Sequence, residues 1–125
     1  MKKREFKNAL YALLDAPIDG LSFDEQISFV EQVLIEYQKD NEVKRDISNK
    51  GKKWTDEDLK IILMDAPSKA NCMKYAKLFH RGYGSIEQIY RWSTTTMDEI
   101  NQTERANDAF ILQIKKVAKE LGLRG

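Results

Sequence analysis

The sequence predicts an all-α protein, a small bundle of five to six helices that contains a trihelical helix-turn-helix unit. Two prolines and six glycines in 125 residues are few for a chain built of many strands. No stretch alternates apolar and polar residues over more than a few positions, whereas several repeat apolar residues at helical spacing. The length and a hydrophobic fraction of 42% suit one compact domain, or a small domain with a helical extension.

Residues 1–43 predict an antiparallel pair of amphipathic helices with an acidic outer face. The first helix ends at Asp15-Ala16-Pro17, because the residue before a proline is pushed out of the α region. Ser22 and Glu25 have the spacing of a capping box, so a second helix starts there and runs to about Asp40. The two apolar stripes are Phe6, Ala9, Leu10, Leu13 and Leu14, and then Phe23, Ile27, Val30, Leu34 and Tyr37.

Residues 44–53 lose the helical period and concentrate the positive charge of the chain. They carry five basic residues and one acidic residue, whereas residues 1–43 carry five basic and nine acidic ones. We expect a flexible, basic linker. It is either a solvated loop or an arm that tracks phosphates beside a recognition unit.

Residues 54–93 predict three short helices separated by two turns. Thr55 with Asp58, and Ser85 with Gln88, have capping-box spacings, and Ser68 can cap the helix between them. A turn with two glycines over residues 80–84 precedes the third helix, which is the arrangement of a helix-turn-helix unit. The inward faces should converge in one core made of Trp54, Leu59, Ile62, Leu63, Ala76, Phe79, Ile86, Ile89 and Trp92.

Residues 94–125 predict a short helical turn and a C-terminal helix that packs on the bundle. Thr96 with Glu99 starts the turn, and Asn101 with Glu104 allows a further start. The last helix carries an apolar stripe and ends at Gly122. Flanking helices or a dimer interface should cover apolar residues that point away from the trihelical core. The stripe is Ala106, Phe110, Ile114, Val117 and Leu121, and the residues to be covered are Ile61, Met64, Met73 and Leu78.

The segment from Trp54 to Trp92 resembles a Myb/SANT-like repeat of the homeodomain-like class. Trp54-Thr55-Asp56-Glu57-Asp58 resembles the opening of such a repeat, Tyr75-Ala76-Lys77-Leu78 its second helix, and Arg91-Trp92 the end of its third. The resemblance covers about a third of the chain and implies a third helix that reads DNA. SANT versions of the family often bind protein instead, so the resemblance leaves the partner open.

Candidate DNA-binding residues follow from the outward faces of these helices. Glu87, Gln88 and Arg91 point away from the core side of the third helix, and Arg and Gln can bond guanine and adenine bidentately. Other basic groups and one helix-start amide could hold phosphates. These candidates are Lys50, Lys52 and Lys53 in the linker, and Lys69, Lys74, Lys77, Arg81 and the Ser85 amide in the trihelical unit.

Catalysis has little support in the sequence, and we expect no enzyme, no cofactor and no metal site. His80 is the sole histidine and Cys72 the sole cysteine, and no nucleophilic triad or phosphate loop is present. No apolar run is long enough to span a bilayer, so we expect an intracellular, cytoplasmic protein. The sequence favours double-stranded DNA as the partner and a small regulator as the function. The alternative is a helical protein-interaction module, an adaptor or inhibitor, with a homodimer or protein partner held by the N-terminal helices.

Overall fold

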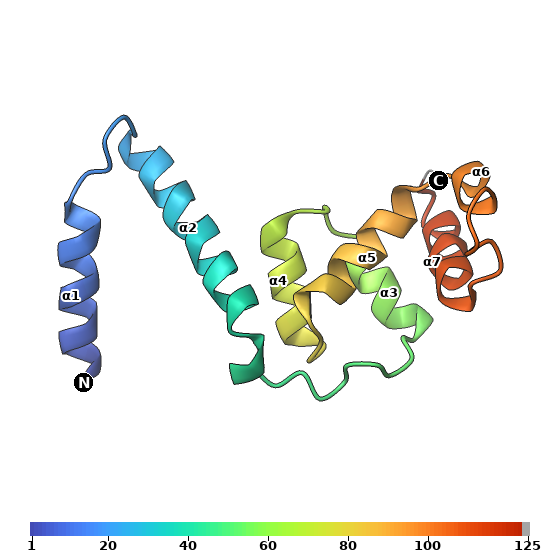
Figure 1. The fold of residues 1–125 in the computed structure, drawn as a ribbon, viewed down its shortest axis with the longest axis horizontal. Helices are drawn as coiled ribbons and strands as arrows, with labels where there is room; N and C mark the ends of the chain where they lie inside the picture. Colours follow the sequence, from blue (N-terminus) through green and yellow to red (C-terminus); the bar gives the residue numbers. More distant parts are fainter. Residues whose placement is uncertain (124–125) are drawn as a thin grey trace. The chain divides into compact units, whose positions relative to one another are not determined.

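A computed structural model describes residues 1–123 and confirms the all-α class. The described residues form seven α-helices and one short 3-10 helix, with no strand among them (Figure 1). The chain divides into two compact units, Met1–Tyr37 and the residues from Gln38 onward. None of the helices in residues 1–123 is long and apolar enough to cross a membrane.

The first unit contains α1 (Lys3–Asp15) and most of α2 (Phe23–Asp40), with the boundaries that the sequence predicts. Ser22 and Glu25 form the predicted reciprocal capping box, with bonds of 3.1 and 3.2 Å. α1 and α2 run in roughly opposite directions, as expected for a helical pair, but they splay apart from their connecting loop and do not pack closely along their lengths (Figure 1). The side chain of Gln26 fixes this elbow. It donates to the carbonyls of Leu14 and Ala16 at 2.8 and 3.3 Å and accepts from the Ile18 amide at 2.9 Å.

The second unit is built around a trihelical core of α3 (Asp56–Leu63), α4 (Lys69–Leu78) and α5 (Tyr83–Thr94). A short α6 (Met97–Asn101) follows, and α7 (Ala109–Glu120) packs on α3 and α5. Of the nine predicted core residues, seven are buried, and Phe79 and Trp92 are half-buried. The most deeply buried side chains are Leu59, Ile62, Ile86, Ile89, Ile100, Ile111, Ile114 and Val117.

Three helix starts in this unit follow the predicted side-chain caps. The hydroxyls of Thr55, Ser68 and Thr96 accept from backbone amides three residues ahead, at 3.0 to 3.2 Å. The C-terminal helix starts later than the spacing of Asn101 and Glu104 suggests. Asp108 caps it instead, accepting from the amides of the second and third residues that follow. These caps satisfy amides that have no partner inside a helix.

The start of α5 corrects the sequence-based prediction. The helix begins at Tyr83 rather than near Ser85, because the carboxylate of Glu42 accepts from the Tyr83 amide at 2.6 Å. Glu42 precedes Tyr83 by 41 residues, so no local spacing could reveal this cap. The turn before α5 is correspondingly short. Its left-handed residue is His80, with φ of 54°, and not one of the two glycines.

Four outer apolar residues of the trihelical unit were expected to be covered, and one of them is buried. Met73 is buried, whereas Ile61, Met64 and Leu78 are between 46% and 76% exposed. Helix α7 covers a different side of the unit, because it contacts α3 and α5. The trihelical unit therefore keeps apolar surface on α3 and at the end of α4.

Candidate nucleic-acid interface

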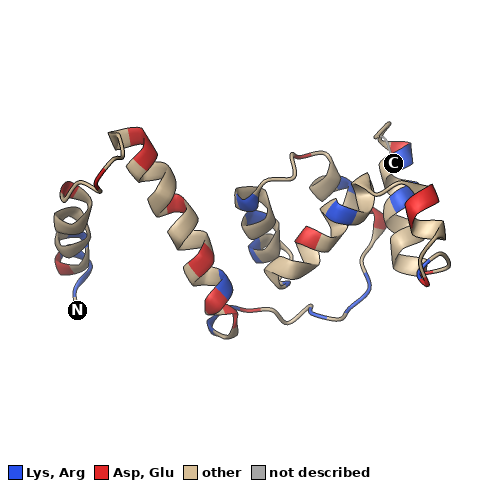
Figure 2. Cartoon of the chain, turned by 45° about the horizontal axis from the view of Figure 1, so that its top comes forward, with Lys and Arg blue, Asp and Glu red and all other residues tan. Residues whose placement is uncertain are grey.

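The outer face of α5 carries the three predicted base-reading residues. Glu87, Gln88 and Arg91 are exposed, while Ile86 and Ile89 on the opposite face are fully buried. The periodicity therefore predicts the orientation of this helix correctly. Basic residues recur along α4, whereas α5 carries one basic and one acidic residue (Figure 2).

A hollow of about 600 Å³ lies beside this face, which we call the linker hollow. The basic segment before Trp54 forms one wall, and the starts of α5 and α7 form the others. Five of the predicted contact residues come together in it. Its lining is Gly51, Lys52, Lys53, Trp54, Arg81, Ser85, Gln88, Ala109, Phe110 and Gln113.

A second hollow, the tryptophan hollow, borders the first at Gln88. It is lined by Gln88, Arg91, Trp92, Thr103, Glu104 and Arg105. The guanidinium carbons of Arg91 and Arg105 lie 5.8 and 5.7 Å from the centre of a Trp92 ring, within cation–π range. Arg105 was not predicted as a contact residue, because it belongs to the loop between α6 and α7. Only the tertiary fold brings that loop to the end of α5.

The basic segment before Trp54 makes several hydrogen bonds with the turn between α4 and α5. The Asn49 side chain donates to the Phe79 carbonyl at 2.9 Å, and its backbone amide donates to the His80 carbonyl at 3.1 Å. The guanidinium of Arg81 donates to the carbonyls of Lys52 and Lys53. These contacts place the two lysines at the linker hollow, while Lys50 is exposed on the same segment outside its lining.

Arg81 is a structural residue, which corrects its prediction as a phosphate contact. Its side chain is buried, with 5% of the residue exposed, and its guanidinium carbon lies 4.0 Å from the centre of a Trp54 ring. Burial lowers the pKa of the guanidinium. A guanidinium used in this way attaches the linker to the trihelical unit, although Arg81 also lines the linker hollow.

The predicted phosphate contact at the Ser85 amide also changes. That amide donates to the Gly82 carbonyl at 3.2 Å, inside the first turn of α5. The Glu42 carboxylate already occupies the Tyr83 amide, so an acidic side chain of the same chain satisfies the start of the helix. Ser85 is still one of the residues that line the linker hollow.

The lysines of α4 form a separate group. Lys69, Lys74 and Lys77 are exposed on this helix and line neither of the two hollows. Lys74 also forms an ion pair with Asp65 at 3.5 Å. All three lysines of α4 are therefore exposed, and Lys74 is also paired with Asp65 of the same chain.

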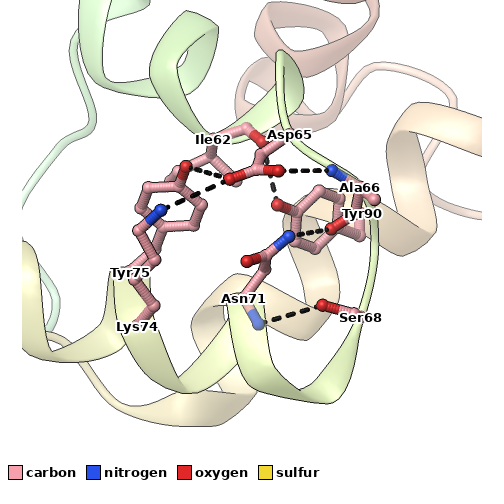
Figure 3. A network of polar contacts seen from close by, with 8 residues as sticks. All are labelled: Ile62, Asp65, Ala66, Ser68, Asn71, Lys74, Tyr75 and Tyr90. Carbon is pink, nitrogen blue, oxygen red and sulfur yellow. Dashed lines mark hydrogen bonds and ion pairs between the residues drawn. The ribbon is translucent and has the colours of Figure 1, made fainter.

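Asp65 organises the turn between α3 and α4 (Figure 3). It accepts from the Tyr75 hydroxyl at 2.7 Å and from the Ala66 amide at 3.0 Å. These hydrogen bonds, with that of Tyr75 the larger, lower the pKa of the Asp65 carboxyl, and the same bond raises the pKa of Tyr75. Nearby, the buried Tyr90 hydroxyl donates to the Ile62 carbonyl at 2.8 Å. This network fixes α4 and α5 on α3 and involves no predicted base-reading residue.

Lys115 closes the other end of α5. Its amino group donates to the carbonyls of Ser93 and Thr95, at 3.1 and 2.7 Å, and only 9% of the residue is exposed. Burial lowers the pKa of this amine. A cation at the C-terminus of a helix satisfies its free carbonyls and complements its dipole. Glu42 thus caps the start of α5 and Lys115 caps its end. This helix carries the candidate interface.

Two comparisons relate the chain to known proteins. A family model described as the uncharacterised protein PM1205 C-terminal domain matches residues 48–125. The chain belongs to the PM1205 family. The uncharacterized protein PM1205 of Pasteurella multocida (strain Pm70) is 49% identical over 125 residues, which cover 99% of each chain. No solved structure matches the chain. Residues 48–125 include the whole trihelical unit and the linings of both hollows. The region that matches the PM1205 C-terminal domain therefore contains the candidate interface.

Proposed function

We propose that this PM1205-family protein binds double-stranded DNA through the outer face of α5, as a small regulator of transcription or of another DNA transaction. The helix would lie in the major groove, where a helix-turn-helix unit places its recognition helix. Gln88 and Arg91 would contact base edges, since their amide and guanidinium groups match adenine and guanine. The supporting observation is that both are exposed, that Gln88 lines both hollows, and that Arg91 lines the tryptophan hollow together with Arg105.

Backbone contacts would come from both sides of this helix. Lys52 and Lys53 lie at the linker hollow, and Arg105 lies at the tryptophan hollow. Lys69, Lys74 and Lys77 on α4 would hold a neighbouring stretch of phosphates. Such contacts position a protein on the duplex without reading its sequence. The hydrogen bonds that attach the linker backbone favour this role, because they hold the backbone of Lys52 and Lys53 beside the linker hollow and so reduce the freedom that binding would cost.

A protein partner is the competing function, and Glu87 is the residue that favours it. A carboxylate on the exposed face of α5 repels phosphates, and SANT-like relatives of the resembled family use this surface for protein. Glu104 adds a second acid at the tryptophan hollow. Across the linings of both hollows, however, Lys52, Lys53, Arg91 and Arg105 outnumber these two acids, which supports DNA as the first candidate.

Fluorescence polarisation with labelled mixed-sequence duplexes, across a series of salt concentrations, tests the proposal. A DNA binder should show a logarithm of affinity that falls linearly with the logarithm of salt, with a slope set by the number of phosphates contacted. Binding should persist near physiological salt. No binding at low salt, or weak binding that vanishes well below physiological salt, would contradict the proposal and favour the protein-interaction function.

A further inference from the structure

Most residues of the apolar stripes of the first unit are exposed, while Leu14, Ile27 and Val30 are half-buried. Phe6, Leu13 and Phe23 are 60%, 73% and 79% exposed, and Gln26 is the one buried residue of α1 and α2. Exposed apolar stripes of this size on soluble proteins mark interaction surfaces. The elbow explains why the stripes do not cover each other, because Gln26 ties both helices to their loop in a diverging arrangement (Figure 1).

The spacing of the stripes is that of a helix that packs along another helix. Phe23, Ile27, Val30, Leu34 and Tyr37 recur at intervals of four and three residues, and Phe6, Leu10 and Leu13 do the same on α1. Alternation of four and three is the heptad pattern of a and d positions, which forms a continuous seam between two helices. Both α1 and α2 therefore present seams of the type that pair with each other.

The charges of the two helices are complementary. Helix α2 carries five acidic residues and one lysine, and its acidic side chains are distributed along the helix (Figure 2). The basic residues of α1 lie at its start, at Lys3, Arg4 and Lys7. Lys7 directly follows Phe6, and Glu31 directly follows Val30, so the two charges flank the same side of their seams. Antiparallel pairing brings equivalent flanks together, and flanking charges set partner choice and orientation.

From this we infer that a second copy of the chain covers the stripes, with α1 of each protomer antiparallel to α2 of its partner. Since the elbow prevents α1 from lying on α2 of its own chain, two copies satisfy both seams at once through one two-fold interface. A two-fold interface is self-complementary, and each protomer supplies one basic and one acidic helix to it. The inference concerns α1 and α2 alone and does not depend on DNA binding.

Sedimentation velocity of the full chain over a range of concentrations tests this interface. We expect a species of twice 14.6 kDa. Val30→Glu places a charge in the seam and should weaken the dimer by about tenfold or more, because a charge buried in an apolar seam has no partner. Gln32→Glu is the matched control, since it adds the same charge to the opposite face of α2. A monomer at every concentration, or equal effects of the two variants, would overturn the inference.

A second set of variants, which exchanges the charges of Lys7 and Glu31, tests the interface even if Val30→Glu disturbs the helices. Lys7→Glu and Glu31→Lys should each weaken the dimer severalfold at low salt, and the double variant should recover most of the loss. Circular dichroism should report equal helix content for all four proteins. A double variant that dimerises no better than the single variants would show that Lys7 and Glu31 do not face each other across the interface, which contradicts the inference.

Discussion

The guanidinium of Arg81 lies over Trp54, 4.0 Å from a ring centre, and donates to the carbonyls of Lys52 and Lys53. One side chain thus covers the aromatic residue that opens the trihelical unit and attaches the basic segment before it. This contact joins the core of the fold to the rim of the candidate interface.

Arg81→Gln should therefore lower the free energy of unfolding by about 1.5–3 kcal/mol, the range for hydrogen bonds made by a charged group. Lys77→Gln removes the same charge from an exposed position of α4 and should change stability by less than about 0.5 kcal/mol. Urea unfolding followed by tryptophan fluorescence measures both. The outcome against this account is that the two variants are equally stable and that Arg81→Gln lowers the salt dependence of DNA binding. Arg81 would then be a phosphate contact, as the sequence predicts.

Lys115 and Lys116 offer a second matched pair. Lys115→Met leaves two carbonyls at the end of α5 without their donor, which should destabilise the protein by about 1–3 kcal/mol. Lys116→Met removes an exposed ion pair with Asp56, 3.1 Å long, and should cost less than about 1 kcal/mol. Thermal unfolding of the two variants provides the measurement. A larger loss for Lys116→Met would contradict the assignment of Lys115 as the cap of α5.

Asp65 gives the fold a predictable dependence on pH. Its carboxyl has a lowered pKa in the folded protein, so the folded state favours the ionised form. The resulting stabilisation is present above the unfolded-state pKa of about 3.9 and is lost as the pH falls through the lower folded-state value. Asp65→Asn should destabilise the protein at neutral pH, and its difference from the wild type should shrink in acid.

Tyr75→Phe is the companion variant, because the Tyr75 hydroxyl is the largest cause of the shift. It should reproduce part of the change in the acid limb of a stability–pH profile measured by urea unfolding. A constant difference between the wild type and Asp65→Asn from pH 7 to pH 2 would show that the ionisation of Asp65 does not contribute.

Removing the negative charge of Glu87 tests the electrostatics of the exposed face of α5. If α5 binds DNA as proposed, Glu87→Gln should raise the affinity for duplex DNA severalfold at low salt, since it removes a carboxylate from the exposed face of α5. Glu57→Gln changes the net charge equally at an exposed position of α3 and serves as the control. Polarisation titrations at two salt concentrations compare them. Equal gains would mean that net charge, and not the α5 face, controls binding.

The sequence predicts the helices well where local chemistry determines them. Thr55, Ser68 and Thr96 cap the helices that their spacings predict, and the burial of Ile86 and Ile89 fixes which side of α5 faces outward. These features depend on residues within one or two helical turns, which a periodic pattern records.

Features that depend on distant residues could not be predicted in the same way. The cap of α5 comes from Glu42, the attachment of the linker from Arg81, and Arg105 approaches Trp92 from a loop after α6. Arg81 looked like a free cation because a helical pattern reports the face of a residue and not its tertiary partners. The divergence of α1 and α2 depends on three hydrogen bonds of Gln26, a polar residue that adjoins the apolar stripe.

The most direct test of the central claim compares Arg91→Ala with Lys77→Ala on a preferred duplex and on variants substituted at each base pair. The account predicts that Arg91→Ala loses about 1–3 kcal/mol of discrimination at one base pair. Lys77→Ala should weaken binding to every duplex about equally and lower the salt slope by about one. If Arg91→Ala keeps the affinity and base preference of the wild type while its fold stays intact, α5 does not read DNA and the central claim is wrong.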